Sequence, residues 1–211
     1  MSKDLISRLN EGPVLCAEGY LFAMERRGYL QAGAFVPEVV LEHPEVVTQL
    51  HREFIRGGSD VVQAFTYYGH REKLRLIGKE NLLEPLQKNA LKIAQDAANE
   101  FPDLDLMVCG DVANTNIYEP DNKQSHVECQ KMYEEQVQWA KEAGVDFIVA
   151  ETISWLEEMK IALKTIKDAG LIAVCNFSIK SKDKTRDGYT PGDACKILED
   201  NGADVVGLNC F

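Results

Sequence analysis

One local pattern occurs three times in the chain and limits what it can fold into: Gly, a small or branched residue and Asp, followed by an apolar run. The three copies are GSDVVQAFT at 58–66, GVDFIVAET at 144–152 and GADVVGLNC at 202–210. Glycine suits the left-handed conformation that ends a helix. A run that is apolar on both faces is typical of a strand in a parallel sheet covered on both sides. Each copy therefore predicts the junction between a helix and a buried strand.

Three further apolar runs fit the same role, and helical patterns separate the six. The runs are VLCAEG at 14–19, LDLMVCGD at 104–111 and LIAVCNFS at 171–178. Three sets of apolar residues recur at helical spacing: Val47, Leu50 and Phe54; Leu83, Leu86, Ala90 and Ile93; Leu156, Met159, Leu163 and Ile166. A regular alternation of strand and helix predicts an α/β fold with a parallel sheet and right-handed crossovers.

Polar residues recur where the predicted strands end, and this favours a barrel over a doubly wound sheet. They are Glu18, Thr66, Asp111, Glu151 and Asn209. A (β/α)8 TIM-type barrel gathers the carboxyl ends of its strands around one mouth. A doubly wound sheet is the alternative, but the chain has neither GxGxxG after its first predicted strand nor GxxxxGKS/T anywhere. The polar loop 178–193 is expected at the same mouth.

The length of the chain is short for a complete barrel. Such a barrel needs roughly 250 residues, whereas this chain has 211 and its sixth predicted strand is the last element. We expect one domain over residues 1–211, a barrel truncated after about six strands and incomplete at its C-terminus. An open parallel sheet that ends on an apolar strand exposes a bare edge, which favours association into a homo-oligomer.

Composition narrows the classes of partner. The net charge of −11 argues against nucleic acid, because phosphate binding draws on a surplus of Lys and Arg. No run of about 18 apolar residues predicts a membrane span, and the N-terminus lacks the apolar region of a secretory signal. The six cysteines are scattered without a CxxC pair, which is typical of a reduced, cytoplasmic protein.

Three positions at the predicted mouth could carry chemistry. Cys210 is either a small buried hydrophobe or a thiolate metal ligand, although zinc takes three or four ligands and no neighbouring cysteine has ligand spacing to it. Glu151 could hold a substrate ammonium or act as a base, or it could be a carboxylate at the start of a helix. Glu18 raises the same choice, and Gly19 beside it would allow close backbone approach to a ligand.

The segment QAFTYYGH at 63–70 places aromatic residues after the second predicted strand. Tyr67 and Tyr68 could cage a quaternary ammonium by cation–π attraction, or they could anchor a packed loop. His70 could be a solvated loop residue. Two carboxylates and a cysteine at one mouth would suit a small, cationic, sulfur-containing amino acid.

The sequence resembles the homocysteine S-methyltransferases, nearest the branch that includes the betaine–homocysteine enzymes. The resemblance runs from about residue 8 to the last residue. It is carried by RLNEG, EGYLFAMERRGYLQAG, HPEVVTQLHREFIRGGSDVVQAFTYY, GVDFIVAET and GADVVGLNC. It implies a (β/α)8 barrel, in agreement with the pattern of strands and helices.

The resemblance also implies roles for particular residues. Cys210 matches the first of three zinc-binding cysteines, and the family's other two lie in a glycine-rich segment after its last strand, beyond Phe211. Zinc is therefore the implied cofactor, with one ligand in this chain. Glu151 matches a homocysteine-binding glutamate. Glu18 matches an aspartate that contacts homocysteine, if one glycine is deleted beside it.

The positions that would bind the methyl donor are partly altered. By resemblance, Tyr68 matches a tyrosine that helps to bind betaine, Phe35 stands where those enzymes carry a tryptophan, and Thr152 where they carry another tyrosine. With Gly19 and Asn209 beside them, these residues complete the expected substrate site. The donor is expected to be a cation, betaine-like or sulfonium.

The implied activity is zinc-dependent transfer of a methyl group to homocysteine sulfur, which gives methionine. Coordination to zinc deprotonates a thiol and so makes it a nucleophile at neutral pH. We expect residues 1–211 alone to be inactive. The alternatives are a non-catalytic relative that binds an amino acid or a partner chain, and different chemistry on the same scaffold.

Overall fold

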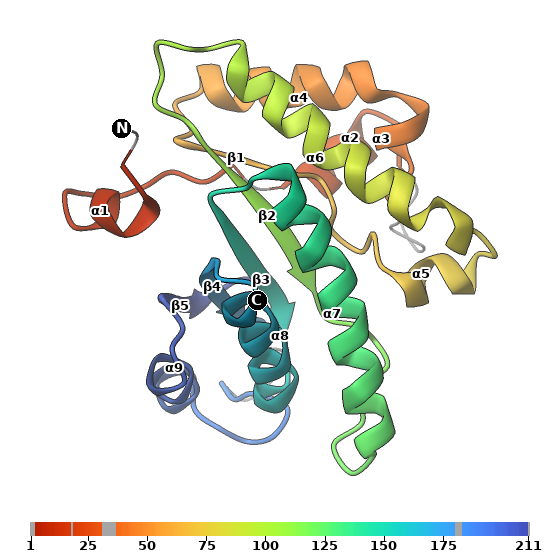
Figure 1. The fold of residues 1–211 in the computed structure, drawn as a ribbon, viewed down its shortest axis with the longest axis vertical. Helices are drawn as coiled ribbons and strands as arrows, with labels where there is room; N and C mark the ends of the chain where they lie inside the picture. The colour runs from red at the N-terminus through yellow and green to blue at the C-terminus, as the bar shows by residue number, and fades with distance from the viewer. Residues whose placement is uncertain (1–2, 18, 31–36, 180–182, 211) are drawn as a thin grey trace.

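The computed structural model describes residues 3–17, 19–30, 37–179 and 183–210. Within them, five parallel strands form one sheet in the order β1-β2-β3-β4-β5 (Figure 1). The strands are β1 (Val61–Gln63), β2 (Met107–Ala113), β3 (Phe147–Ile153), β4 (Ile172–Phe177) and β5 (Val205–Leu208). Because each strand pairs with the next in the chain, the sheet follows the strand order of a barrel wall, as the sequence predicts.

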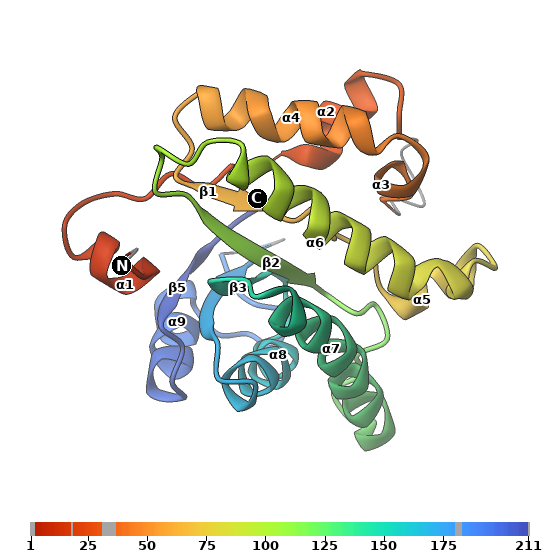
Figure 2. The ribbon, with the colours of Figure 1, turned by 45° about the horizontal axis from the view of Figure 1, so that its top comes forward.

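Helices connect the strands and cover one face of the sheet. Figure 2 shows α4, α6, α7, α8 and α9 in succession around the outside of the strands. The helices are α1 (Leu5–Leu9), α2 (Tyr20–Arg26), α3 (Val39–Glu42), α4 (Pro44–Arg56), α5 (Arg71–Leu76), the 3-10 helix η1 (Glu80–Leu82), α6 (Leu83–Asn99), α7 (Lys123–Ala143), α8 (Leu156–Asp168) and α9 (Pro191–Asp200). In the described part of the chain, no helix is long and apolar enough to cross a membrane.

The first predicted strand, at 14–19, is wrong as a full strand. Among the described residues of this run, Cys16 forms a parallel bridge with Val61 and no longer pairing follows. The extended run ends early because Gly19 adopts a left-handed conformation, with φ 82°, and α2 begins at Tyr20. The described residues therefore contain five strands instead of six.

The glycine and the aspartate of the repeated pattern have separate structural roles. The glycines, Gly58, Gly144 and Gly202, all have positive φ, as predicted for residues that end a helix. The aspartates each accept a hydrogen bond from a backbone N–H of the preceding strand segment: Leu15 N to Asp60 Oδ2 at 2.8 Å, Val108 N to Asp146 Oδ2 at 2.7 Å and Ala173 N to Asp204 Oδ2 at 2.8 Å.

The backbone at these aspartates pairs with the same neighbouring segment. The N–H of Asp146 donates to the carbonyl of Val108 at 2.8 Å, and the N–H of Asp204 donates to that of Ala173 at 3.1 Å. Each of these aspartates thus binds one residue of the neighbouring strand with both its side chain and its backbone. This contact fixes the register in which the next strand joins the sheet.

The inner face of the sheet changes from apolar to polar along the strands. Its apolar part is made by Val61, Met107, Cys109, Phe147, Val149 and Val174, which form one buried cluster with Leu5 of α1. Side chains alternate between the two faces of a strand, so the residues two positions further on share this face. These are Gln63 after Val61, Asp111 after Cys109 and Glu151 after Val149. The polar groups therefore gather at the carboxyl ends of β1, β2 and β3.

Replacing Asp146 by Ala should lower the free energy of unfolding by about 1–2 kcal/mol, because it removes a hydrogen bond to a charged acceptor at a partly exposed site. Urea unfolding followed by circular dichroism measures the change. The matched control is Asp103→Ala in the exposed loop before β2, where a change within about 0.5 kcal/mol is expected. Equal losses in the two variants would contradict the role of Asp146 in the strand register.

Candidate functional site

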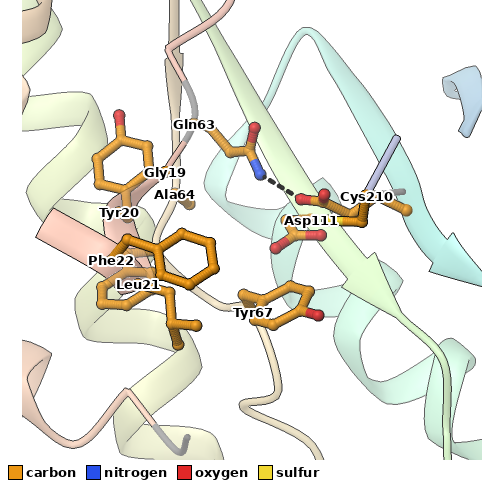
Figure 3. A pocket seen from close by; sticks show the side chains of 11 residues that line it. Gly19, Tyr20, Leu21, Phe22, Gln63, Ala64, Tyr67, Asp111 and Cys210 are labelled. Carbon is orange, nitrogen blue, oxygen red and sulfur yellow. Dashed lines mark hydrogen bonds between the residues drawn. The ribbon is translucent and has the colours of Figure 1, made fainter. Parts of the chain in front are cut away.

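A cavity of about 220 Å³ opens at the carboxyl ends of β1, β2 and β3 (Figure 3). It is lined by Gly19, Tyr20, Leu21, Phe22, Gln63, Ala64, Phe65, Tyr67, Asp111, Glu151 and Cys210. Because the lining comes from strand ends and from the start of α2, the cavity lies at the mouth where the sequence places the functional residues. Three of the predicted site residues, Gly19, Glu151 and Cys210, line it.

Glu151 is held in one orientation by two side-chain amides. It lies in β3 and is 8% exposed. Gln63 donates from Nε2 to Glu151 Oε1 at 2.9 Å, the dashed line in Figure 3. Asn209 donates from Nδ2 to Glu151 Oε2 at 2.7 Å. Gln63 and Asn209 come from opposite ends of the sheet, so their bonds fix the carboxylate across the mouth.

Gln63 contacts Glu151 through its amide nitrogen and a cysteine through its amide oxygen. The Cys16 thiol lies 3.7 Å from Gln63 Oε1 and can donate to it. Gln63 was not among the predicted site residues. The signal that could have found it is its place as the polar residue of an otherwise apolar strand, two positions after the inward-facing Val61.

Thr152 is a strained residue beside Glu151. Its φ is 59°, which is rare for a β-branched residue. The register between β3 and β4 shifts between Ala150 and Ile153, so Thr152 lies in an irregularity of the strand. Asn209 compensates: its Oδ1 accepts from Thr152 N at 3.0 Å and its Nδ2 donates to Thr152 Oγ1 at 3.0 Å. The two predicted site residues Thr152 and Asn209 are therefore brought together.

Cys210 lies at the rim of the cavity. It is exposed, so the interpretation of Cys210 as a small buried hydrophobe is wrong. Its φ is 49°, and its carbonyl accepts a hydrogen bond from Ser178 Oγ at 2.9 Å. Ser178 follows β4, so this bond ties the end of the described chain to the neighbouring strand. Cys210 and Glu151 line the same cavity.

The described residues do not by themselves fit a zinc site. Zinc takes three or four protein ligands from Cys, His, Asp and Glu. In residues 3–17, 19–30, 37–179 and 183–210 there is no group of three or more such side chains that could hold a metal ion. Within these ranges, the family resemblance assigns Cys210 alone to zinc.

Asp111 is a second acidic residue of the cavity. It lies in β2, is 4% exposed and lines the cavity with Glu151. It was predicted as a polar residue at a strand end, without a role of its own. The signal that could have placed Asp111 is the alternation of side chains along the strand, because Asp111 lies two positions after the inward-facing Cys109. Cys109 is itself buried, and burial raises the pKa of its thiol well above the ordinary value.

The two adjacent tyrosines point to different spaces. Tyr67 lines the cavity with Glu151, whereas Tyr68 lines a neighbouring cavity. Their ring centroids are 4.2 Å apart. The ammonium of Lys73 lies 4.3 Å from the centroid of the Tyr68 ring, so one face of Tyr68 already carries a cation. Burial raises the pKa of Tyr67, which keeps its hydroxyl neutral.

His70 is not a solvated loop residue, and that interpretation is wrong. It is 1% exposed and caps the N-terminus of α5, where its Nδ1 accepts from Lys73 N at 3.4 Å. Burial, followed by the nearby charge of Lys73, lowers the pKa of His70 to about 4. Its imidazole is therefore neutral at physiological pH. Two other predicted site residues, Glu18 and Phe35, lie outside the described residues.

The chain is similar to homocysteine methyltransferases over most of its length. A family model described as homocysteine S-methyltransferase matches residues 19–211. Betaine–homocysteine S-methyltransferase 1 of Xenopus tropicalis is 36% identical over 213 residues, which cover 99% of this chain and 51% of that protein. The Sus scrofa protein of the same name is 35% identical over 99% of this chain and 74% of its own. The chain thus spans about half the length of the Xenopus relative.

A solved structure confirms the predicted fold class. The homocysteine methyltransferase MmuM from Escherichia coli, in its metallated form, superposes with a TM-score of 0.81 over 97% of this chain and 77% of that chain. Its sequence identity is 20%, so the likeness concerns the fold alone.

The buried histidine gives a prediction about pH. Because the pKa of His70 is about 4 in the folded chain and about 6.5 when exposed, the unfolded chain binds an extra proton between these values. Stability should therefore fall as the pH drops from 6.5 to 4. His51, whose pKa burial lowers to about 3, acts in the same direction.

His70→Asn, which keeps a capping acceptor, should remove roughly 2–3 kcal/mol of this pH-dependent loss. Urea unfolding at pH 7 and pH 4.5 measures it. The unmodified chain, measured at the same two pH values, is the reference. If His70→Asn lost as much stability between pH 7 and pH 4.5 as the unmodified chain, the lowered pKa of His70 would be contradicted.

Proposed function

Because the chain belongs to the homocysteine S-methyltransferase family, we propose that it binds homocysteine in the mouth cavity and takes part in methyl transfer to the homocysteine sulfur. The observation that carries the proposal is the convergence of Glu151 and Cys210 on one cavity of about 220 Å³. The resemblance assigns Glu151 to homocysteine and Cys210 to zinc. The product of such a transfer would be methionine.

Glu151 is the proposed partner of the homocysteine ammonium. A carboxylate offers about four acceptor sites, so one carboxylate can accept from two amides and also from an ammonium. Its two amide bonds, from Gln63 and Asn209, give it a defined direction before substrate arrives. Preorganisation of this kind lowers the entropy that binding must overcome. Burial at 8% exposure also strengthens its attraction for a cation.

The reaction requires a cationic methyl donor aligned with the sulfur. The homocysteine S–H gives its proton to solvent, and the S–CH3 bond forms as the donor's N–CH3 or S–CH3 bond breaks. The donor leaves as a neutral tertiary amine or thioether. Zinc, when bound, would keep the substrate sulfur as a nucleophilic thiolate. We propose Cys210 as one of its ligands, and the described residues do not supply the others.

Aromatic side chains of the cavity support a cationic donor. Phe22 and Tyr67 lie around the same space as Asp111 and Cys210 in Figure 3, and aromatic faces attract quaternary ammonium and sulfonium groups. Tyr68 is less suited to this role than the resemblance implies, because Lys73 already lies over its ring. We therefore propose Tyr67 in place of Tyr68 as the donor-facing tyrosine.

Glu151→Gln should weaken homocysteine binding by about 10- to 100-fold, because it removes a charge-assisted hydrogen bond worth roughly 1.5–3 kcal/mol. Isothermal titration calorimetry gives the Kd, and a methyl-transfer assay gives the KM where activity is present. Glu142→Gln on α7 is the matched control. An unchanged Kd in Glu151→Gln would overturn the assignment. Binding through Glu151 without any transfer would favour the non-catalytic alternative.

Purified chain 1–211 should carry far less than one zinc ion per chain, because Cys210 is the single zinc ligand assigned to it. Elemental analysis by mass spectrometry measures the content, with Cys195→Ser on α9 as the control. Stoichiometric zinc that disappears in Cys210→Ser but persists in Cys195→Ser would contradict this expectation. It would mean that other groups of the chain, or a second copy, complete the site.

A further inference from the structure

A second cavity, of about 160 Å³, lies at the same mouth and is lined mainly by polar groups. Its lining comes from the segments that follow four strands: Tyr68 after β1, Asn114 and Asn116 after β2, Trp155 after β3 and Arg186 after β4, with Glu158 from the first turn of α8. Tyr68 borders this cavity and its ring neighbour Tyr67 borders the first one. The two cavities are therefore adjacent and separately lined.

Glu158 brings a buried carboxyl group to the second cavity. It is 2% exposed. Its Oε1 accepts three hydrogen bonds, from Thr115 N at 2.8 Å, Thr115 Oγ1 at 2.6 Å and Tyr133 Oη at 3.3 Å. Within the described residues, no such bond reaches Oε2. The side chain is thus held rigidly through one oxygen while it lines the cavity.

A cation in the second cavity would stabilise the carboxylate form of Glu158. Burial raises the pKa of this carboxyl, and the nearby charge of Arg186 acts in the opposite direction. A buried carboxylate is stabilised when an opposite charge comes within a few ångströms. An ammonium in the cavity would supply both that charge and N–H donors.

Arg186 brings a positive charge to the lining of the same cavity. Its backbone N–H donates to the carbonyl of Ser154 at 2.8 Å, and Asp187 Oδ2 accepts from Leu156 N at 2.9 Å. These two bonds fix the loop against the start of α8. The guanidinium carbon lies 6.0 Å from the centroid of the Trp155 ring. In the described part of the chain, Arg186 forms no ion pair with an acidic side chain within 4 Å. A guanidinium binds a carboxylate well, so Arg186 can bind the carboxylate of a ligand.

We propose that this second cavity binds a small free α-amino acid, with its carboxylate on Arg186 and its ammonium on Glu158. Asn114 and Asn116 supply further polar groups at the wall, where Asn114 Nδ2 donates to Asn116 Oδ1 at 2.7 Å. The size is consistent with this ligand, because a cavity of about 150 Å³ holds benzene, which has as many heavy atoms as alanine. The site is separate from the proposed homocysteine site and does not depend on methyl transfer.

The test is calorimetric titration of the chain with L-alanine. Arg186→Gln should weaken binding about tenfold or more, because it removes a charged partner of the carboxylate. Lys184→Gln, at an exposed cation in the same loop, is the control and should change the Kd by less than about twofold. Undetectable binding of L-alanine to the unmodified chain, or equal Kd values for the chain and Arg186→Gln, would overturn the proposal.

Two further measurements locate the ligand. Glu151→Gln should leave L-alanine binding unchanged while it weakens homocysteine binding. Loss of L-alanine binding in Glu151→Gln would place the amino acid in the first cavity and overturn the second site. Trimethylglycine has a carboxylate but no N–H, so in a competition titration it should displace L-alanine at least about tenfold more weakly than unlabelled L-alanine does. Displacement of L-alanine by trimethylglycine at equal or lower concentration would overturn the role given to Glu158.

Glu158→Gln removes the charge but keeps the shape and an acceptor for Thr115. With a circular dichroism spectrum like that of the unmodified chain, it should weaken L-alanine binding about tenfold or more. Unchanged binding in this variant would contradict the ammonium contact, whatever the fate of the methyl-transfer proposal.

Discussion

The register of the parallel strands is the constraint on which the rest of the structure depends. Asp60, Asp146 and Asp204 set it, each by accepting a hydrogen bond from the backbone of the preceding strand segment. A shift of one residue would turn every side chain of a strand to the opposite face. Glu151 would then point toward the helices, and the mouth would lose its carboxylate. A local feature of the sequence therefore decides the chemistry at the far end of the strands.

The mouth is polar because the side chains on the inner face of the sheet change from apolar to polar along the strands. Apolar residues occupy the amino-terminal part of this face, and Gln63, Asp111 and Glu151 lie at its carboxyl-terminal part. Gln63 and Asn209, from the two ends of the sheet, then hold Glu151 between them. Asn209 also stabilises the strained backbone at Thr152. The same amide thus supports both the carboxylate and the irregular end of β3, which makes Asn209 a structural support of the site as well as a predicted substrate contact.

The elements were largely predictable because they depend on local patterns. Hydrophobic periodicity indicated α4, α6 and α8, and the Gly-x-Asp repeat indicated three strand starts. Tertiary contacts decided the rest. The run 14–19 has the composition of a strand, but α2 begins too soon after it. Cys210, Glu151 and Asn209 were predicted at one mouth, whereas the contributions of Gln63 and Tyr67 depend on which face or cavity each meets. The placement of Glu158 and Arg186 around one cavity depends on a loop whose path the sequence does not give.

The proposed function rests on one contact, between the ammonium of homocysteine and Glu151 as Gln63 and Asn209 orient it. A crystal structure of the chain grown with homocysteine tests this contact most directly. We expect the homocysteine nitrogen within about 3 Å of a Glu151 carboxylate oxygen, with both amide bonds retained and the sulfur directed toward Cys210. Homocysteine bound in the cavity without contact to Glu151, or bound elsewhere on the chain, would contradict the proposal.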